Sequence, residues 1–181
     1  MKQAASTVFV VRPARFGFNA ETAESNNFQQ VPTNLSAADA EARAVAEFGA
    51  LVETLRSRGV QVRVFDDTPA PAKPDAVFPN NWLSLHADGR AVLYPMCAPN
   101  RRPERRPDIV AALGQEFGIA EVLDLSGAEA EGRFLEGTGS IIFDHEHRRA
   151  YAGRSPRTEP GLLADACAQL GYQPVSFPVR R

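Results

Sequence analysis

A unit of two strands, one helix and a further strand recurs along the chain, and this repeat constrains the fold more than any other feature. Short β-branched or aromatic runs are joined by turn residues, and a helical pattern and another strand follow each pair. The unit returns at a spacing of about 50 residues. Units of this size cannot bury their apolar faces alone and must stack on one another. The sequence therefore predicts an α/β fold built from ββαβ repeats.

The first unit has a long loop where the others have a hairpin. We predict a strand over Thr7–Val11, a helix from the cap residue Ser36 to about Arg58, and a strand over Val60–Phe65. The helix has one apolar stripe, formed by Ala40, Ala44, Phe48, Leu51 and Leu55. The polar loop Arg15–Asn34 has no periodicity. Two interpretations stay open: a lid over a site, with Gly17 permitting movement, or a surface loop without a role.

The second and third units are more regular. The second is predicted as a hairpin of strands 76–85 and 91–94 around Asp88-Gly89, a helix over 107–117 and a strand over 119–125. The third is a hairpin of strands 139–143 and 150–152, a helix over 160–170 and a strand over 173–177. One domain, 1–181, would then contain blades at about 5–66, 74–126 and 133–179. Tight hairpins favour small mixed sheets over the alternative, a doubly wound parallel sheet.

Composition argues against several classes of partner. The net charge of -2 favours neither nucleic acid nor an anionic membrane. The basic segment Asn100–Arg106 keeps nucleic-acid binding as a weaker alternative, but no aromatic residues interleave with its arginines. No signal-like N-terminus is evident, and no apolar run reaches the roughly 20 residues of a membrane span. We therefore expect a soluble cytoplasmic protein.

The cysteines and histidines point to no metal site. Cys97 and Cys167 are too few for a disulfide framework and are interpreted as inert, small apolar residues. His86, His145 and His147 fall in the predicted hairpin turns and are interpreted as solvated. A pair of histidines without further ligands makes a poor zinc site. We expect neither a metal nor a cofactor.

Four stretches resemble the pentein superfamily, which includes arginine deiminases, amidinotransferases and dimethylarginine hydrolases. They are PDAVFPNNW at 74–82, YPMCAPNRRPE at 94–104, LEGTGS at 135–140 and SPRT at 155–158. The opening segment RPARFGFNAETAESNNFQ resembles a bacterial, arginine deiminase-related amidinotransferase branch, some members of which hydrolyse citrulline. The resemblance implies a pentein-type propeller of five ββαβ blades around a central active site. The chain would be incomplete, with about three of the five blades.

The resemblance also implies substrate-binding residues in the first motif. Asp75, Asn80 and Asn81 stand where dimethylarginine hydrolases present acidic residues to the substrate. Two carboxylates suit a cationic guanidinium, whereas two amides both donate and accept and suit a neutral ureido group better. The alternative for the amides is a turn in which they bond their own backbone. We therefore expect a substrate less cationic than arginine, with citrulline favoured.

Charged residues of the other motifs complete the implied site. Arg102 and Arg157 match arginines that bind the substrate carboxylate, because a planar guanidinium pairs with it in a bidentate way. Most of the arginines over 101–106 are interpreted as a solvated helix start. Glu136 matches an acid that binds or polarises the reacting group, or supports the histidine, and is the catalytic candidate. Thr138 replaces the second glycine of the motif, and Gly139 replaces the acid that often follows.

The implied function is the N-terminal, substrate-binding portion of a cysteine-dependent hydrolase acting on the guanidino or ureido group of an arginine-like amino acid. The family's nucleophilic cysteine and catalytic histidine have no counterpart in this sequence, so whether the chain is an enzyme stays open. The alternative is a catalytically inactive module for small-molecule binding or interaction. Because an incomplete propeller leaves faces exposed, a second copy or a completing chain is a further expected partner.

Overall fold

The computed structural model describes residues 3–23, 26, 29 and 35–179. Parts of the predicted Arg15–Asn34 loop therefore lie outside the described residues. The chain divides into two compact units: an N-terminal unit of residues 4–79, and a C-terminal unit formed by Gln3 and the residues from Asn80 onward. Among the described helices, none is long and apolar enough to cross a bilayer.

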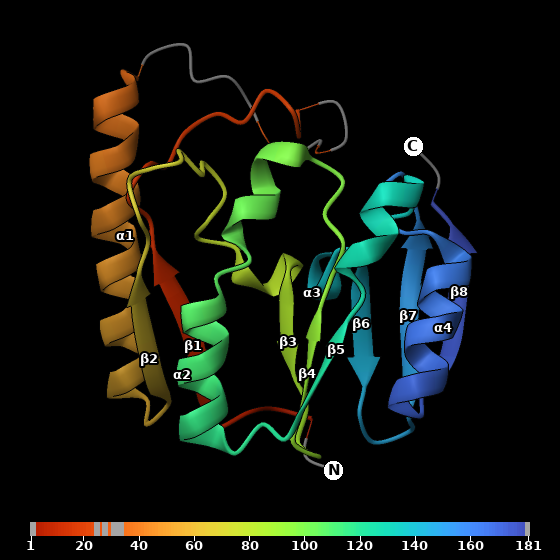
Figure 1. Ribbon diagram of the computed structural model, residues 1–181. Helices are drawn as coiled ribbons and strands as arrows, with labels where there is room; N and C mark the ends of the chain where they lie inside the picture. Colours follow the sequence, from red (N-terminus) through yellow and green to blue (C-terminus); the bar gives the residue numbers. More distant parts are fainter. Residues whose placement is uncertain (1–2, 24–25, 27–28, 30–34, 180–181) are drawn as a thin grey trace. The chain divides into compact units, whose positions relative to one another are not determined.

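The N-terminal unit contains one helix and two parallel strands. Strand β1 (Thr7–Arg12) pairs with β2 (Gln61–Asp66), and helix α1 (Ala37–Ser57) lies beside β2 (Figure 1). Ser36 caps α1 as predicted, because its hydroxyl accepts the N–H of Asp39 at 3.1 Å. The predicted stripe is only partly right: Phe48 is buried, but Leu51 is 52% exposed and Val52 is buried in its place.

The C-terminal unit repeats one topology twice. Strands β3 (Leu83–Leu85) and β4 (Arg90–Leu93) form a hairpin, helix α2 (Pro107–Phe117) follows, and β5 (Glu121–Asp124) returns parallel to β4. Strands β6 (Ile141–Asp144) and β7 (Arg149–Arg154), helix α4 (Pro160–Leu170) and β8 (Gln173–Pro178) do the same (Figure 1). Both are ββαβ units, so the predicted repeat is present.

The two sheets of this unit share a core. Buried residues from β4 and the position after it, from β6 and β7 and from α4 belong to one apolar cluster. They include Val92 and Tyr94, Ile141 and Phe143, and Leu163 and Leu170. The cluster supports the argument that a single repeat cannot bury its own apolar face.

A turn replaces most of the strand predicted over 76–85. Only Leu83–Leu85 is a strand, and Pro79–Asn81 is a 3-10 helix. Proline has no N–H to give to a sheet, and consecutive asparagines favour turns. The strand predicted from Gly139 begins only at Ile141, because Gly137–Ser140 forms a short helix, α3.

The glycine at the start of α3 lies against the 3-10 helix. Gly137 has a φ of +39°, and a side chain there would collide with the carbonyl oxygen of Asn80 and lie 3.0 Å from that of Asn81. Both the backbone conformation and the space therefore require glycine at this position.

The interpretation of the histidines as solvated turn residues was wrong for His86 and only partly right for His145, which lies in the turn between β6 and β7 but is half-buried. His86 is 9% exposed and makes edge contacts with the rings of Phe143 and Tyr172. Its Nε2 lies 2.9 Å from the hydroxyl of Ser84. His145 stacks on Phe143 and bonds the Tyr172 hydroxyl through Nδ1 at 2.6 Å. His147 is exposed, as predicted.

We predict that Gly137→Ala lowers the free energy of unfolding by about 2 kcal/mol or more, because alanine is strained at positive φ and its Cβ collides with backbone. Gly127→Ala is the matched control, since nothing lies within 4 Å of a Cβ at that position. Urea denaturation of both variants checks this, and equal stabilities would contradict it.

We predict that His86 makes stability depend on pH. Burial lowers the pKa of His86 to about 4, from an ordinary value of 6.5. The unfolded chain therefore binds more protons between these values, and the folded state loses up to about 3 kcal/mol as pH falls through that range. Urea denaturation should show a weaker pH dependence for His86→Gln, whereas the exposed control His147→Gln should keep the wild-type slope. Parallel curves for wild type and His86→Gln would contradict the assignment.

Candidate functional site

A buried carboxylate lies at the centre of the candidate site. Glu136 is 1% exposed and accepts hydrogen bonds from the side-chain amide of Asn81 at 3.1 Å and the backbone N–H of Cys97 at 3.1 Å. The guanidinium of Arg157 donates to the same carboxylate at 3.4 Å. A charge this deeply buried is costly unless it is paired and hydrogen-bonded. Three separate segments supply that compensation.

Backbone contacts hold two of the sequence motifs together. The N–H of Glu136 donates to the carbonyl of Arg157 at 3.2 Å, and the hydroxyl of Ser140 donates to the same oxygen at 2.9 Å. Leu135 and Thr158 form an isolated antiparallel bridge beside them. LEGTGS and SPRT therefore form one structural element, although they are about 20 residues apart in sequence.

The absence of a side chain at Gly139 leaves space for the side chain of Asn81. A Cβ at position 139 would collide with Asn81 Nδ2, which is the atom that donates to Glu136. The sequence comparison with penteins expects an acid there, so this departure both removes a negative charge and makes room for the amide.

A second buried ion pair lies beside Glu136. Arg101 is 3% exposed and binds Glu104 through two hydrogen bonds of 2.9 Å, with a longer ion pair of 3.9 Å to Glu136. The interpretation of this segment as a solvated helix start was therefore wrong for Arg101. Pro99–Glu104 is a 3-10 helix, in which side chains three residues apart lie on one line, so Arg101 meets Glu104 directly.

Arg102 and Arg105 share another carboxylate. Glu129 lies 3.2 Å from Nε of Arg102 and accepts two hydrogen bonds from the guanidinium of Arg105. It also accepts the backbone N–H of Met96 at 2.7 Å. Arg102 is one-third exposed, so its guanidinium is accessible while its Nε is held.

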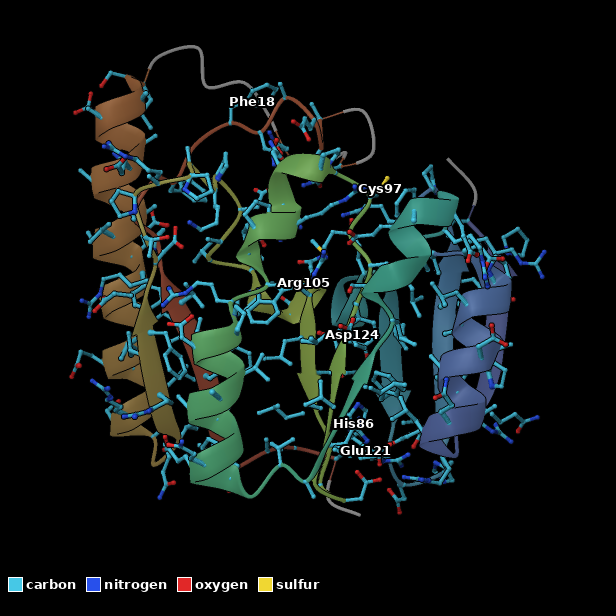
Figure 2. The ribbon with its side chains drawn as sticks, in the orientation of Figure 1. Phe18, His86, Cys97, Arg105, Glu121 and Asp124 are labelled. Carbon is cyan, nitrogen blue, oxygen red and sulfur yellow. The ribbon has the colours of Figure 1, made fainter. Side chains whose placement is uncertain are left out.

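Cys97 lies among these charged groups. Burial raises the pKa of its thiol, Glu136 raises it further, and Arg157 and Arg102 lower it. All three charges are therefore close enough to act on one sulfur atom. Figure 2 shows Cys97 and His86 at opposite ends of the β3–β4–β5 sheet, so the buried histidine belongs to a different region. Cys167 is fully buried in α4, with its pKa raised to about 11 by burial, as expected for an inert residue.

Asp75 belongs to the N-terminal unit and is bound by the long loop. Its carboxylate accepts a hydrogen bond from the side chain of Asn19 at 2.7 Å and one from Thr22 at 3.4 Å. Gln29 bonds both the carbonyl of Asn19 and the hydroxyl of Thr22. Asn19 and Thr22 are almost fully buried, so this part of the loop is anchored on Asp75. The lid role itself stays a prediction.

The structure brings together some of the predicted residues. Glu136 is in direct contact with Asn81 and with Arg157. Arg102 lies near them, because Arg102, Arg157 and Glu136 all shift the pKa of the Cys97 thiol. Asn80 is exposed at the edge, and its carbonyl contacts Thr138. Sequence reasoning interpreted Cys97 as inert and gave it no place in the site, and it missed Glu129 and the Arg101–Glu104 pair. The three-residue spacing of that pair was a usable signal, whereas no local pattern marks Glu129.

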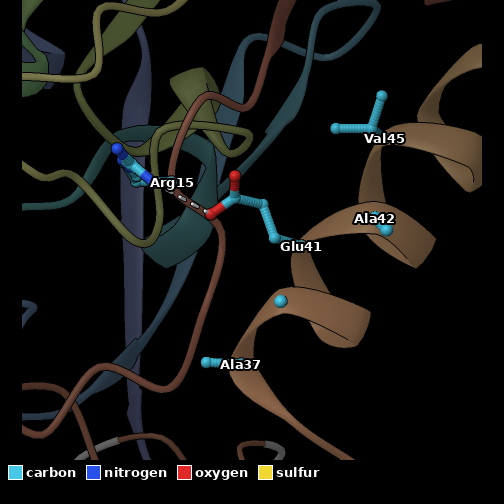
Figure 3. Close-up of a pocket in the computed structure, with 6 residues that line it drawn as sticks. Arg15, Ala37, Glu41, Ala42 and Val45 are labelled. Carbon is cyan, nitrogen blue, oxygen red and sulfur yellow. Dashed lines mark ion pairs between the residues drawn. The ribbon is translucent and has the colours of Figure 1, made fainter.

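The grooves of the N-terminal unit involve other residues. One groove of about 580 Å³ runs along α1 between Arg15 and Val45, where Arg15 faces Glu41 at 3.9 Å (Figure 3). A second, of about 620 Å³, lies between α1 and Phe16, Val77 and Phe78. None of the predicted site residues lines either groove.

Solved structures with the same fold share little sequence with this chain. Dimethylarginine dimethylaminohydrolase from Pseudomonas aeruginosa, complexed with citrulline, is 17% identical with a TM-score of 0.68; the match covers 97% of this chain and 61% of that one. The substrate-bound N-terminal domain of ArgZ, a cyanobacterial arginine dihydrolase, is 23% identical with a TM-score of 0.70, covering 97% and 58%. These matches confirm the predicted pentein-type α/β fold, and this chain spans about three-fifths of those relatives.

A family model gives the assignment. A comparison with curated proteins gave no match. The model described as eukaryotic N,N dimethylarginine dimethylhydrolase, however, matches residues 12–181. That range includes the Glu136 cluster, the arginines of the second motif and both ββαβ units of the C-terminal unit. The chain therefore belongs to the dimethylarginine dimethylhydrolase family, within the pentein superfamily.

Proposed function

We propose that this chain is the substrate-binding portion of a cysteine-dependent hydrolase that acts on the guanidino or ureido group of an arginine-like amino acid. The observation that carries the proposal is the contact of Glu136 with Asn81 and Arg157, beside Cys97 and Arg102. A carboxylate and an amide can bond the planar nitrogen group, and guanidiniums can bind the carboxylate of the same small molecule.

Charge balance favours a neutral ureido group and hence citrulline. Around the reacting position, Glu136 and Glu104 are offset by Arg157 and Arg101, so these four side chains have no net charge. A cationic guanidinium would find no surplus negative charge among them. The amide of Asn81 adds none, and its carbonyl oxygen can accept from a ureido N–H. Asp75 and Asn80 are the further proposed contacts to this group.

The proposed role of Arg102 and Arg157 is to hold the amino-acid carboxylate. Both guanidiniums are partly exposed, at 33% and 24%, whereas Arg101 is sealed by its pairing with Glu104. A ligand carboxylate can pair with an arginine in a bidentate way only where two N–H groups of the guanidinium are accessible. The partial exposure of Arg102 and Arg157 meets this requirement.

A second function, binding without hydrolysis, is supported by the state of Cys97. A nucleophilic cysteine needs a lowered pKa, and this one is raised. Cys97 and His86 lie at opposite ends of the β3–β4–β5 sheet, so within the described residues these two do not form the cysteine–histidine pair of the family's chemistry (Figure 2). Citrulline turnover to ornithine distinguishes a hydrolase from a binding module.

We predict that alkylation of Cys97 by iodoacetamide follows a pH profile displaced above that of a free cysteine, since burial and Glu136 both raise the pKa of its thiol. Glu136→Gln removes one of these causes, so more thiolate forms at a given pH and the reaction becomes faster. Glu131→Gln, an exposed change, is the control. Peptide mass spectrometry reports the rate at Cys97 alone, and an unchanged profile in Glu136→Gln would contradict the site geometry.

We predict that the wild-type chain binds citrulline more tightly than arginine, and that Asn81→Asp shifts the ratio toward arginine by about tenfold, because it adds a negative charge beside the reacting group. Calorimetry with both ligands measures the ratio. Gln169→Glu is the control: it adds the same charge at an exposed position of α4, where its backbone carbonyl bonds Arg90.

Two outcomes would count against the proposal in different ways. A wild-type chain that prefers arginine would contradict the citrulline assignment only. A chain that binds neither ligand would contradict the substrate-binding role.

A further inference from the structure

The carboxylate of Glu129 is nearly buried and is contacted by three N–H-bearing groups, one from the backbone and two from arginine side chains. It lies in the 3-10 helix Ser126–Glu131, is 11% exposed, and binds the N–H of Met96 and the guanidiniums of Arg102 and Arg105. Glu129 therefore connects the segment 126–131, which precedes the LEGTGS motif, to three residues at 96–105 in and beside the second motif.

The two arginines are held in different ways. Arg105 directs both terminal nitrogens at Glu129, and one of them also lies 3.3 Å from the carbonyl of Tyr94. Arg102 contacts Glu129 through Nε, and the same Nε donates to the carbonyl of Met96 at 3.2 Å. Within the described part of the chain, no hydrogen bond reaches the terminal nitrogens of Arg102.

This difference decides which arginine can bind a ligand. A guanidinium held by Nε presents its two terminal N–H groups in the opposite direction, in the geometry that pairs with a carboxylate. The field of Arg102 lowers the pKa of the Cys97 thiol, so the guanidinium is near Cys97, whose backbone N–H donates to Glu136 at 3.1 Å. Both terminal nitrogens of Arg105 donate to Glu129, so this guanidinium cannot pair with a ligand carboxylate in the same way.

We propose that Glu129 is a positioning residue that aims Arg102 at the α-carboxylate of the amino-acid ligand and thereby sets the requirement for that carboxylate. The inference rests on the proposed function, since it needs an amino-acid ligand at the Glu136 cluster. Glu129 leaves the pair of arginines with one surplus positive charge, which matches one carboxylate.

The test compares citrulline with N-carbamoylputrescine, which has the same ureido group and no carboxylate. Calorimetry in 0.3 M salt screens loose attraction to the surplus positive charge. We expect the wild-type chain to prefer citrulline by about tenfold or more, and Glu129→Gln to reduce this ratio to about threefold or less. Glu131→Gln is the matched control from the same 3-10 helix and should keep the wild-type ratio, because the partner of Glu131 among the described residues is the half-exposed Arg133.

A double variant separates positioning from general damage. If Glu129 acts through Arg102, adding Glu129→Gln to Arg102→Met should reduce the ratio no further than Arg102→Met alone. Should Glu129→Gln fail to fold, Glu129→Asp decides, since its shorter carboxylate should give a ratio between those of wild type and Arg102→Met.

The failures are distinguishable. No citrulline binding by the wild-type chain overturns the proposed function and this inference with it. A wild-type preference that persists in Glu129→Gln, or in Glu129→Asp where that variant decides, overturns the inference alone. Equal binding of both ligands by the wild-type chain also overturns it, while leaving recognition of the ureido group intact.

Discussion

Burial of the Glu136 carboxylate is the constraint on which the candidate site depends. A charge with 1% exposure must be compensated, and its donors come from the Asn81 turn, the segment after β4 and the Arg157 loop. These three segments are far apart in the sequence, and folding brings them together at Glu136. The same requirement explains why Gly137 and Gly139 occupy α3, since larger residues would displace the turn that delivers Asn81. One buried carboxylate thus ties the positions of three motifs to one another.

Charge pairing around this carboxylate links the structure to the proposed ligand. The Arg101–Glu104 pair is sealed, Arg157 offsets Glu136, and Glu129 engages Arg105 completely while leaving part of Arg102 exposed. A neutral group next to Glu136 and one negative group next to Arg102 would satisfy this pattern. A ureido amino acid has both.

Sequence reasoning succeeded where local rules set the structure and failed where distant contacts did. Helices α2 and α4 match the predicted ranges because proline begins each and a left-handed glycine, Gly118 or Gly171, ends it. The Pro79 turn was mistaken for a strand, and Arg101 and His86 were assigned to solvent, since their partners are remote or depend on the turn type. Glu136 and Arg157 were found through family resemblance. Glu129 could not be identified as a site residue from the sequence, because no periodicity or motif connects it with Arg102.

Chemical-shift mapping can show directly whether a ureido amino acid binds at the Glu136 cluster. Citrulline should be titrated into the ¹⁵N-labelled chain while the backbone amide of Cys97, the side-chain amide of Asn81 and the Nε signals of Arg102 and Arg157 are followed. We expect saturable shifts concentrated on these four groups. Shifts confined to the groove along α1, between Ala37 and Val45, or no shifts at millimolar citrulline, would contradict it.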